Sequence, residues 1–213
     1  MGLKKVVFLG AKNIGLECLR ELYNRAESLG VEVALVITNE RGVKIAEFCE
    51  KNNLPFSLEL ESLFKLEADL LLCVQYHKIL KESHLSCAKA AFNLHLAPLP
   101  EYRGCNQFSF AILNEDEFFG VTLHKMDLGV DSGDIAFISR FRIPPFCFVD
   151  ELVELANAKG LELFKNSLES LVKGDYELIP QAAVESKRRE FHLRAEIESL
   201  KEIKLSACGG GGA

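Results

Sequence analysis

The chain has 213 residues, of which 48% are hydrophobic, and it carries a formal net charge of −6. A chain of this length buries about 70% of its unfolded surface, which is enough for one sizeable core and leaves no room for a second catalytic domain. The acidic balance argues against a nucleic-acid-binding surface, because phosphate contacts need clustered Lys and Arg, and the one dense basic run, residues 187–189, is interpreted as a solvated face.

The cysteines and the apolar runs indicate the cellular compartment. Seven cysteines are present, an odd number, and they are widely spaced, which is typical of neither a disulfide framework nor a zinc site. We therefore expect buried, reduced thiols and no bound metal. The N-terminus lacks a signal-like apolar region, and no run approaches the roughly 18 apolar residues that span a bilayer. The sequence predicts a soluble, cytoplasmic protein that binds neither membrane nor nucleic acid.

The N-terminal part of the chain alternates apolar runs with amphipathic segments. Strands are expected at residues 4–10, 31–38 and 68–74, where apolar residues are continuous. Helices are expected from Asn13 to about Gly30 and at residues 42–52, the second with Val43 on its inner face. This order predicts an α/β fold with a doubly wound, mostly parallel, Rossmann-like sheet and helices on both faces.

The turn at residues 10–15 connects the first strand to the first helix. It is not a GxGxxG motif and lacks the Gly-Lys-Ser/Thr ending of a phosphate loop, so dinucleotide binding and triphosphate hydrolysis are poorly supported. Two interpretations stay open. Either the turn is structural, with Asn13 as the helix cap, or free N–H groups beside Lys12 bind a phosphate-bearing acceptor.

After the third strand, residues 75–85 read QYHKILKESHL. By pattern alone, Ile79, Leu80 and Leu85 are interpreted as core residues. His77 and His84 are expected at the surface, and two isolated histidines seven positions apart do not form a metal site.

Polar side chains alternate with apolar ones in the strand expected at residues 92–96. Asn93 and His95 therefore stand side by side on one face, opposite three apolar side chains. Pro98 and Pro100 end the strand, after which Tyr-Arg-Gly turns the chain toward a helix at residues 106–113. A polar pair at a strand end, followed by a rigid loop, is a suitable place for a site.

A second polar segment, GVDSGDI, covers residues 129–135. Gly129 and Gly133 permit positive φ on both sides of Asp131, so the loop can present this carboxylate into a cleft. Asp134 is the competing carboxylate, but it stands at the start of the next strand. An amide, an imidazole and a carboxylate supply an oxyanion donor, a proton-moving group and an anion that orients the imidazole. This set fits acyl transfer without a side-chain nucleophile.

The remaining elements complete the expected domain. Residues 119–126 and 135–143 are expected as strands of the central sheet, with His124 opposite Leu123. A long amphipathic helix is expected at residues 148–172 and a short one at 190–205. We expect one catalytic domain over residues 1–175, a C-terminal extension over 176–206 and a flexible, glycine-rich tail over 207–213.

Two segments carry a resemblance to a known family. AFNLHLAPLPEYRG at residues 91–104 and GVTLHKMDLGVDSGDI at residues 120–135 resemble the folate-dependent formyltransferases. That family has the pattern Asn-x-His-x-(Ser/Ala)-x-Leu-Pro-x-Tyr-Arg-Gly, followed by Gly-Val-Thr-x-His-x-Met-Asp-x-Gly-x-Asp-(Thr/Ser)-Gly. Its catalytic Asn, His and Asp match Asn93, His95 and Asp131. The resemblance extends more weakly from Val6 to about Leu171.

The resemblance implies a co-substrate, 10-formyltetrahydrofolate, and no metal. It implies folate-binding positions in the segment after the third strand and in the Asp131 loop, namely Lys78, Ile79, Leu80, Asp127, Gly129 and Val130. It implies acceptor-binding positions at Gly10, Lys12, Tyr102, Arg103 and His124. His124 is expected to support the reaction without a primary role. For Arg103 a structural role, bonding loop carbonyls, stays open beside substrate contact.

The resemblance to one branch of the family narrows the class of acceptor substrate. Phe-Asn-Leu-His, Tyr-Arg-Gly and Gly-Val-Thr-Leu-His-Lys-Met look most like the branch that formylates nucleotide-linked amino sugars. A tRNA acceptor is disfavoured because few residues follow the long helix and the chain is acidic. The alternatives are a glycinamide ribonucleotide formyltransferase, a formyltetrahydrofolate hydrolase and a catalytically inactive binding module. The partners expected are small molecules and a second copy of the chain in a homodimer.

Overall fold

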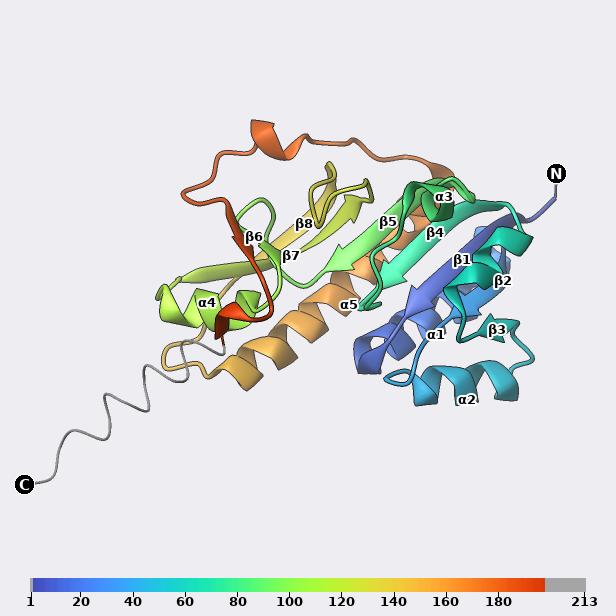
Figure 1. Cartoon of the computed structure of the whole chain (residues 1–213), viewed down its shortest axis with the longest axis horizontal. Coiled ribbons are helices and arrows are strands. Elements are labelled where there is room, and N and C mark those ends of the chain that lie inside the picture. Colours follow the sequence, from blue (N-terminus) through green and yellow to red (C-terminus); the bar gives the residue numbers. More distant parts are fainter. Residues whose placement is uncertain (1, 198–213) are drawn as a thin grey trace, which may run out of the picture.

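The computed structural model in Figure 1 describes residues 2–197, and the chain forms a seven-stranded sheet in the order β3-β2-β1-β4-β5-β7-β8. The strands are β1 Lys4–Gly10, β2 Val31–Ile37, β3 Phe56–Ser57, β4 Ala68–Val74, β5 Ala88–His95, β7 Phe118–Lys125 and β8 Ile135–Arg142. A second, two-stranded sheet pairs β6 Tyr102–Gly104 with β9 Glu190–His192. The helices are α1 Lys12–Leu29, α2 Val43–Lys51, α3 Glu82–Leu85, α4 Gln107–Leu113 and α5 Val149–Lys173, with 3-10 helices η1 Leu60–Lys65 and η2 Gln181–Ala183.

The predicted fold class is confirmed. The five strands β3, β2, β1, β4 and β5 pair parallel with one another. Strand β7 pairs antiparallel with both β5 and β8. Strand β1 lies between β2 and β4. The chain therefore adds β2 and β3 on one side of β1 and then places β4 and β5 on its other side. The strands expected at residues 119–126 and 135–143 are β7 and β8 of this sheet, with β8 at its edge.

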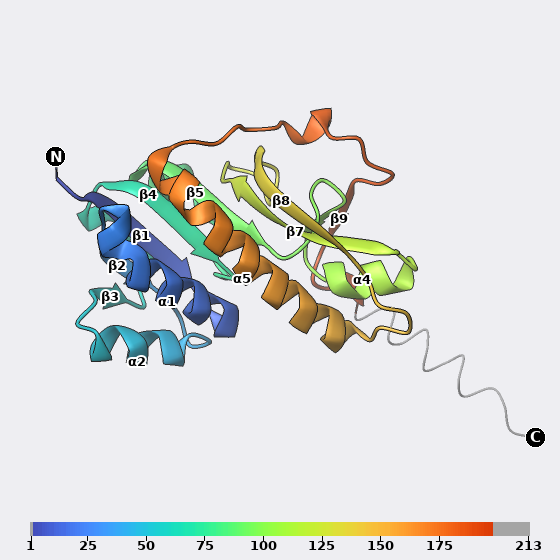
Figure 2. The same ribbon diagram turned by 180° about the vertical axis from the view of Figure 1, so that it is seen from behind.

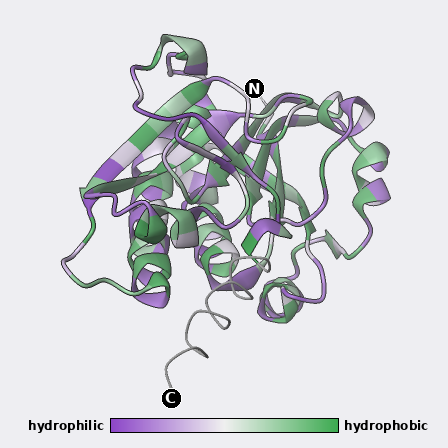
Figure 3. Cartoon of the chain, turned by 60° about the vertical axis from the view of Figure 1, so that its left-hand side comes forward, coloured by the Kyte–Doolittle hydropathy of each residue, from purple (hydrophilic) through white to green (hydrophobic). Residues whose placement is uncertain are grey.

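The sheet separates two cores. Alternate residues of β1 point to opposite faces, so Val6 and Phe8 join one cluster while Val7 and Leu9 join the other. Helices α1 and α5 cover the first face, in front in Figure 2. The second face is covered by η1 and by Leu80 in the segment before α3. Figure 3 shows hydrophobic residues along the strands of the sheet and both hydrophobic and hydrophilic residues on the helices.

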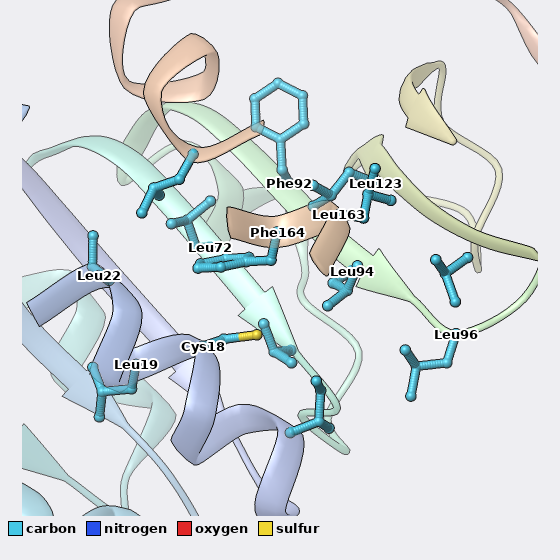
Figure 4. Packing of buried hydrophobic residues seen from close by; sticks show 14 of the residues in the cluster. Cys18, Leu19, Leu22, Leu72, Phe92, Leu94, Leu96, Leu123, Leu163 and Phe164 are labelled. Atoms are coloured by element: carbon cyan, nitrogen blue, oxygen red, sulfur yellow. The ribbon is translucent and has the colours of Figure 1, made fainter. Parts of the chain in front are cut away.

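Helix α5 packs closely on the strand that carries Asn93 and His95. Phe164 of α5 lies in the cluster with Leu72 of β4 and Leu94 of β5 (Figure 4). Gly160 allows this approach, because a Cβ atom at that position would lie 2.6 Å from Cδ2 of Leu96. The apolar side of β5 is thus locked against α5, and its polar side is left to face the pocket.

Several local predictions were wrong. Asn13 does not cap α1, which begins at Lys12 after Ala11 and has no side-chain cap. Val43 is 59% exposed and Ile79 is 69% exposed, so neither is a core residue. His84 is buried instead of exposed, because its Nδ1 accepts a hydrogen bond from the Lys81 N–H and its ring stacks on Phe64.

The C-terminal predictions are partly testable. Residues 190–192 form strand β9 where a helix was expected, while residues 198–205 and the tail at 207–213 lie outside the described part of the chain. The basic run at 187–189 is not simply solvated. Arg188 forms an ion pair with Asp116, and Arg189 donates to the carbonyls of Gln181 and Val184.

The described cysteines are free thiols, and three of them, Cys18, Cys49 and Cys73, are buried as expected. Burial raises the pKa of Cys49 to about 11 and that of Cys73 to about 12, so both stay neutral. None of the helices within residues 2–197 combines the length and the apolar character that crossing a bilayer requires.

The packing of β5 gives a first prediction. Replacing the fully buried Phe92, whose ring meets Tyr176 edge-on at 5.0 Å, with Ala should lower the free energy of unfolding by about 3–5 kcal/mol. The matched control is Phe146→Ala, because Phe146 is 97% exposed and its loss should change stability by less than about 0.5 kcal/mol. Urea unfolding of both variants measures the difference, and equal losses would contradict the described core.

Candidate active site

A pocket of about 760 Å³ lies at the carboxyl ends of β1, β4 and β5. This is the switch point of the parallel sheet, where connections leave β1 and β4 toward opposite sides and where ligands bind in open α/β folds. Most residues predicted for the site line this pocket: Lys12, Lys78, Ile79, Leu80, Asn93, His95, His124, Asp127, Gly129, Val130 and Asp131.

Asn93, His95 and Asp131 converge at the pocket. Antiparallel pairing of β5 and β7 sets Asn93 opposite His124, and the loop after β7 returns Asp131 over both strands. The Asn93 Nδ2 lies 3.3 Å from Asp131 Oδ1 and 3.1 Å from His124 Nε2. The His95 Nδ1 lies 3.6 Å from Asp131 Oδ2, and the His124 Nε2 lies 3.4 Å from Asp131 Oδ1. One carboxylate therefore faces two imidazoles and an amide.

Backbone carbonyls fix one proton on each imidazole. The Nε2 of His95 lies 2.8 Å from the carbonyl oxygen of Tyr102, and the Nδ1 of His124 lies 2.9 Å from that of Lys125. A carbonyl only accepts, so both of these nitrogens donate. The remaining nitrogen of each ring faces Asp131. An additional proton on either ring would point at the carboxylate.

Asp131 is held as an anion. Burial alone would raise its pKa, but the charge of a protonated His95, the hydrogen bond and charge of His124 and the Gly104 N–H at 3.0 Å together lower the pKa well below its usual range. The carboxylate is thus ionised throughout the neutral range.

The backbone of the Asp131 loop differs from the expectation. Positive φ occurs at Asp131 itself, with φ 49°, and not at the flanking glycines. Gly133 is instead required by contact, because a Cβ atom there would lie 1.8 Å from the carbonyl oxygen of Lys125. Lys12, Gln75 and Asn106, which also line the pocket, have positive φ as well. Such backbone strain concentrates at functional sites.

Three predicted substrate-binding residues do not line the pocket. Gly10 ends β1, where its carbonyl accepts from Thr38. The side chain of Tyr102 is buried, and its hydroxyl donates to Asp116 and accepts from Asn114 and Arg188. Arg103 follows the structural alternative, since its Nε donates to the carbonyl of Val130 at 3.2 Å. These three residues lie behind the pocket wall and do not form part of its surface.

Cations gather beside the start of α1. Lys12, Arg41 and Arg194 line the pocket, and the Lys12 ammonium donates to Oε1 of Gln75 at 2.8 Å. Burial, followed by the charges of Arg41 and Arg194, lowers the pKa of Lys12. The first turn of α1 contains no acidic residue, so its N-terminal N–H groups add to the positive potential. This part of the pocket suits an anion.

Sequence reasoning missed several lining residues. Arg41 follows β2, and Phe191, His192, Leu193 and Arg194 belong to the segment that begins with β9. Nothing in the local pattern of residues 190–194 indicates a pocket wall, because the contact is made by pairing β9 with the distant β6. Gln181, which bonds the carbonyls of Asp131 and Gly133, was also missed.

Comparison with known proteins identifies the class. Residues 59–159 match the family model described as formyl transferase. The chain is 29% identical over 201 residues to a methionyl-tRNA formyltransferase of Agathobacter rectalis, covering 85% of the chain and 64% of that protein. It is 31% identical over 197 residues to a methionyl-tRNA formyltransferase of Thermotoga maritima, covering 83% of the chain and 61% of that protein. Residues 59–159 are thus similar in sequence to formyl transferases, and the chain spans less than two thirds of the length of these relatives.

Solved structures agree on the fold. A sugar 3N-formyl transferase, determined in the presence of dTDP and 5-N-formyl-THF, superimposes with a TM-score of 0.80 at 22% identity over 92% of the chain and 72% of that structure. An N-formyltransferase from Helicobacter canadensis, in complex with folinic acid and dTDP-3-aminofucose, gives 0.77 at 23% identity over 91% and 72%. Phosphoribosylglycinamide formyltransferase from Bacillus halodurans gives 0.69 at 22% identity over 79% and 95%.

The lowered pKa of Asp131 predicts a pH dependence of stability. A carboxylate with a lowered pKa stabilises the folded state above its ordinary value near ~3.9, and this contribution is lost as the pH falls through the lower folded value. We therefore expect Asp131→Asn to lose less unfolding free energy than the wild type on acidification from about pH 6 to about pH 3. Urea titrations across this range measure it. Parallel curves for the two proteins would contradict the described electrostatics.

Proposed function

We propose that the chain transfers a formyl group from 10-formyltetrahydrofolate to the primary amine of a nucleotide-linked amino sugar. The observation that carries the proposal is the convergence of Asn93, His95 and Asp131 in one pocket, with Asp131 3.3 Å from the amide and 3.6 Å from the imidazole. The match to the formyl transferase family model and the solved structures that hold a formyl-folate support the donor.

The chemistry follows from the donors in the pocket. The neutral amine attacks the formyl carbon, and negative charge develops on the formyl oxygen. Asn93 and His95 both line the pocket, and their contacts of 3.3 and 3.6 Å with Asp131 are longer than an optimal hydrogen bond, so a small rotation of either side chain would let it donate to this oxygen. The new carbon–nitrogen bond forms as the bond to N10 of the folate breaks.

The proton balance assigns Asp131 its role. The amine loses one proton and the folate N10 gains one, so the transfer needs no net acid or base. Because the pKa of Asp131 is lowered, the carboxylate is a weak base and does not retain that proton. Asp131 chiefly holds the positive charge of the imidazole beside the formyl oxygen, and it passes the proton onward directly or through water.

The walls of the pocket divide between two substrates. Ile79, exposed on the pocket wall, and the backbone of Gly129 and Val130 suit the planar ring of the folate. Lys12 and Arg41, beside the α1 N-terminus, suit the phosphates of the acceptor. Solved relatives with dTDP or dTDP-3-aminofucose in their descriptions favour a nucleotide-linked sugar.

A second candidate is supported by the curated relatives, which are methionyl-tRNA formyltransferases. In that case the amine would be the α-amino group of an aminoacyl-tRNA. The net charge of −6 disfavours this acceptor, because tRNA binding relies on many phosphate contacts.

The direct test is tetrahydrofolate release from 10-formyltetrahydrofolate with separate acceptors: nucleotide-linked amino sugars, glycinamide ribonucleotide, methionyl-tRNA and no amine. We expect turnover with a nucleotide-linked amino sugar. Turnover with only one of the other amines would replace the acceptor and keep the chemistry. Formate release without any amine would identify a hydrolase, and no turnover in any arm would reject transfer.

Removing the donors should abolish most turnover. Asn93→Ala and His95→Ala should each lower kcat by about 100- to 1,000-fold, because each removes a donor to the developing oxyanion. One control is Asn52→Ala, which removes a hydrogen bond from the Asn52 side-chain amide to the Phe48 carbonyl outside the pocket. The other is His84→Ala, which removes a buried imidazole outside the pocket. Steady-state kinetics should show near-normal kcat for both controls, and losses like those of the site variants would refute the assignment.

The cationic part of the pocket predicts a selective binding defect. Lys12→Met keeps the side-chain stem but removes its charge, so it should raise KM for the phosphorylated acceptor about 10- to 100-fold. KM for the folate should stay near the wild-type value. Lys44→Met on the exposed side of α2 is the control. An equal rise in KM for an unphosphorylated amino sugar would show that Lys12 does not read phosphate.

A further inference from the structure

The segment that follows α5 pairs with the start of β8 at Ile179 before it reaches β9, and its path is the orange-to-red trace in Figures 1 and 2. Gln181 in η2 is 8% exposed, and its side chain enters the Asp131 loop. Its Nε2 lies 2.8 Å from the carbonyl oxygen of Asp131 and 2.9 Å from that of Gly133. An amide nitrogen carries two hydrogens, so both are committed to this loop.

The loop needs such an anchor at this point. Asp131 has φ 49°, a left-handed conformation that costs a non-glycine residue about 1–2 kcal/mol. A residue in this region keeps its conformation only when its surroundings hold it there. The two bonds from Gln181 occupy the carbonyls on either side of Ser132 and thereby fix the peptide units that follow the catalytic carboxylate.

The earlier half of the loop has separate anchors. Arg103 donates to the Val130 carbonyl, and the Asp127 carboxylate accepts from the Gly129 N–H at 3.0 Å. These are the positions assigned to the folate. Loss of Gln181 therefore affects the placement of Asp131 more than the placement of the folate-binding backbone.

Gln181 is itself rigidly placed. Two residues before it, Ile179 exchanges two backbone hydrogen bonds with Ile135 at the start of β8, at 2.8 and 2.9 Å. The guanidinium of Arg189, eight residues after it, donates to the carbonyls of Gln181 and Val184. The amide of Gln181 is thus held at a fixed distance from the loop.

We propose that Gln181 is a positioning residue for Asp131, acting through two hydrogen bonds from the C-terminal segment to the catalytic loop. The inference rests on the proposed formyl transfer. It extends the site to a residue 50 positions beyond Asp131 that does not line the pocket.

The experiment compares Gln181→Met with the wild type. Met keeps the length and volume of Gln and removes both donors. A displacement of the carboxylate by about 1 Å should lower kcat about 10- to 100-fold, while KM for 10-formyltetrahydrofolate stays near the wild-type value. The control Asn52→Leu removes a hydrogen bond of the same kind, from a side-chain amide to a backbone carbonyl, at the end of α2. It should leave kcat unchanged. Unchanged kcat in Gln181→Met, or an equal loss in the control, would overturn the proposal.

A second measurement separates this inference from the proposed function. In the substrate-free protein, the imidazole nitrogen signals of His95 and His124 in NMR spectra report the position of the Asp131 carboxylate. We expect these signals to shift in Gln181→Met and to stay in place in Asn52→Leu. If the wild type formylated no amine, the proposed function would fail, and the spectra alone would decide the role of Gln181. Unshifted signals would overturn it.

Discussion

The ionised carboxylate of Asp131, buried between two imidazoles, is the interaction on which the site depends. Burial by itself would favour the neutral acid, so the charge persists only because His95, His124 and the Gly104 N–H compensate it. Each imidazole is in turn oriented by a backbone carbonyl. Asn93 and His95 line the pocket beside this carboxylate, and they are the donors proposed for the formyl oxygen. All the chemistry proposed for the chain uses this one arrangement of charges.

The arrangement is possible because the sheet changes direction at β5. Parallel pairing with β4 brings the carboxyl end of β5 to the switch point, where a pocket forms. Antiparallel pairing with β7 then sets His124 beside Asn93 and sends the following loop back over the same place. The Met126 N–H bonds the Ala91 carbonyl, which fixes where that return begins.

What could be predicted from the sequence follows from its periodicity. Continuous apolar runs gave the buried parallel strands, and alternation over residues 92–96 put Asn93 and His95 on one face. Tyr102 was assigned to the acceptor from the resemblance alone, whereas its side chain is buried and its ring centroid lies 6.1 Å from that of Phe119. His84 was misassigned because the hydrogen bond that satisfies its buried ring comes from a backbone N–H. Gln181 and Arg194 reach the site only through the tertiary path of the C-terminal segment, for which residues 176–189 carry no periodic signal and the pattern from residue 190 onward indicated a helix instead of strand β9.

The distribution of charge explains how an acidic chain can attract an anionic substrate. The chain has a net charge of −6, yet the described pocket walls include Lys12, Arg41, Lys78 and Arg194 against only two acids, Asp127 and Asp131. Both acids belong to the loop after β7, and Asp131 is already compensated by imidazoles. The positive potential therefore remains beside α1, and within a cleft it is screened by salt less than at an open surface. An acceptor with phosphates at α1 must extend its far end toward Asn93, which requires the amine to lie on the part of the molecule distant from the phosphates. An amino sugar linked through a diphosphate has this arrangement.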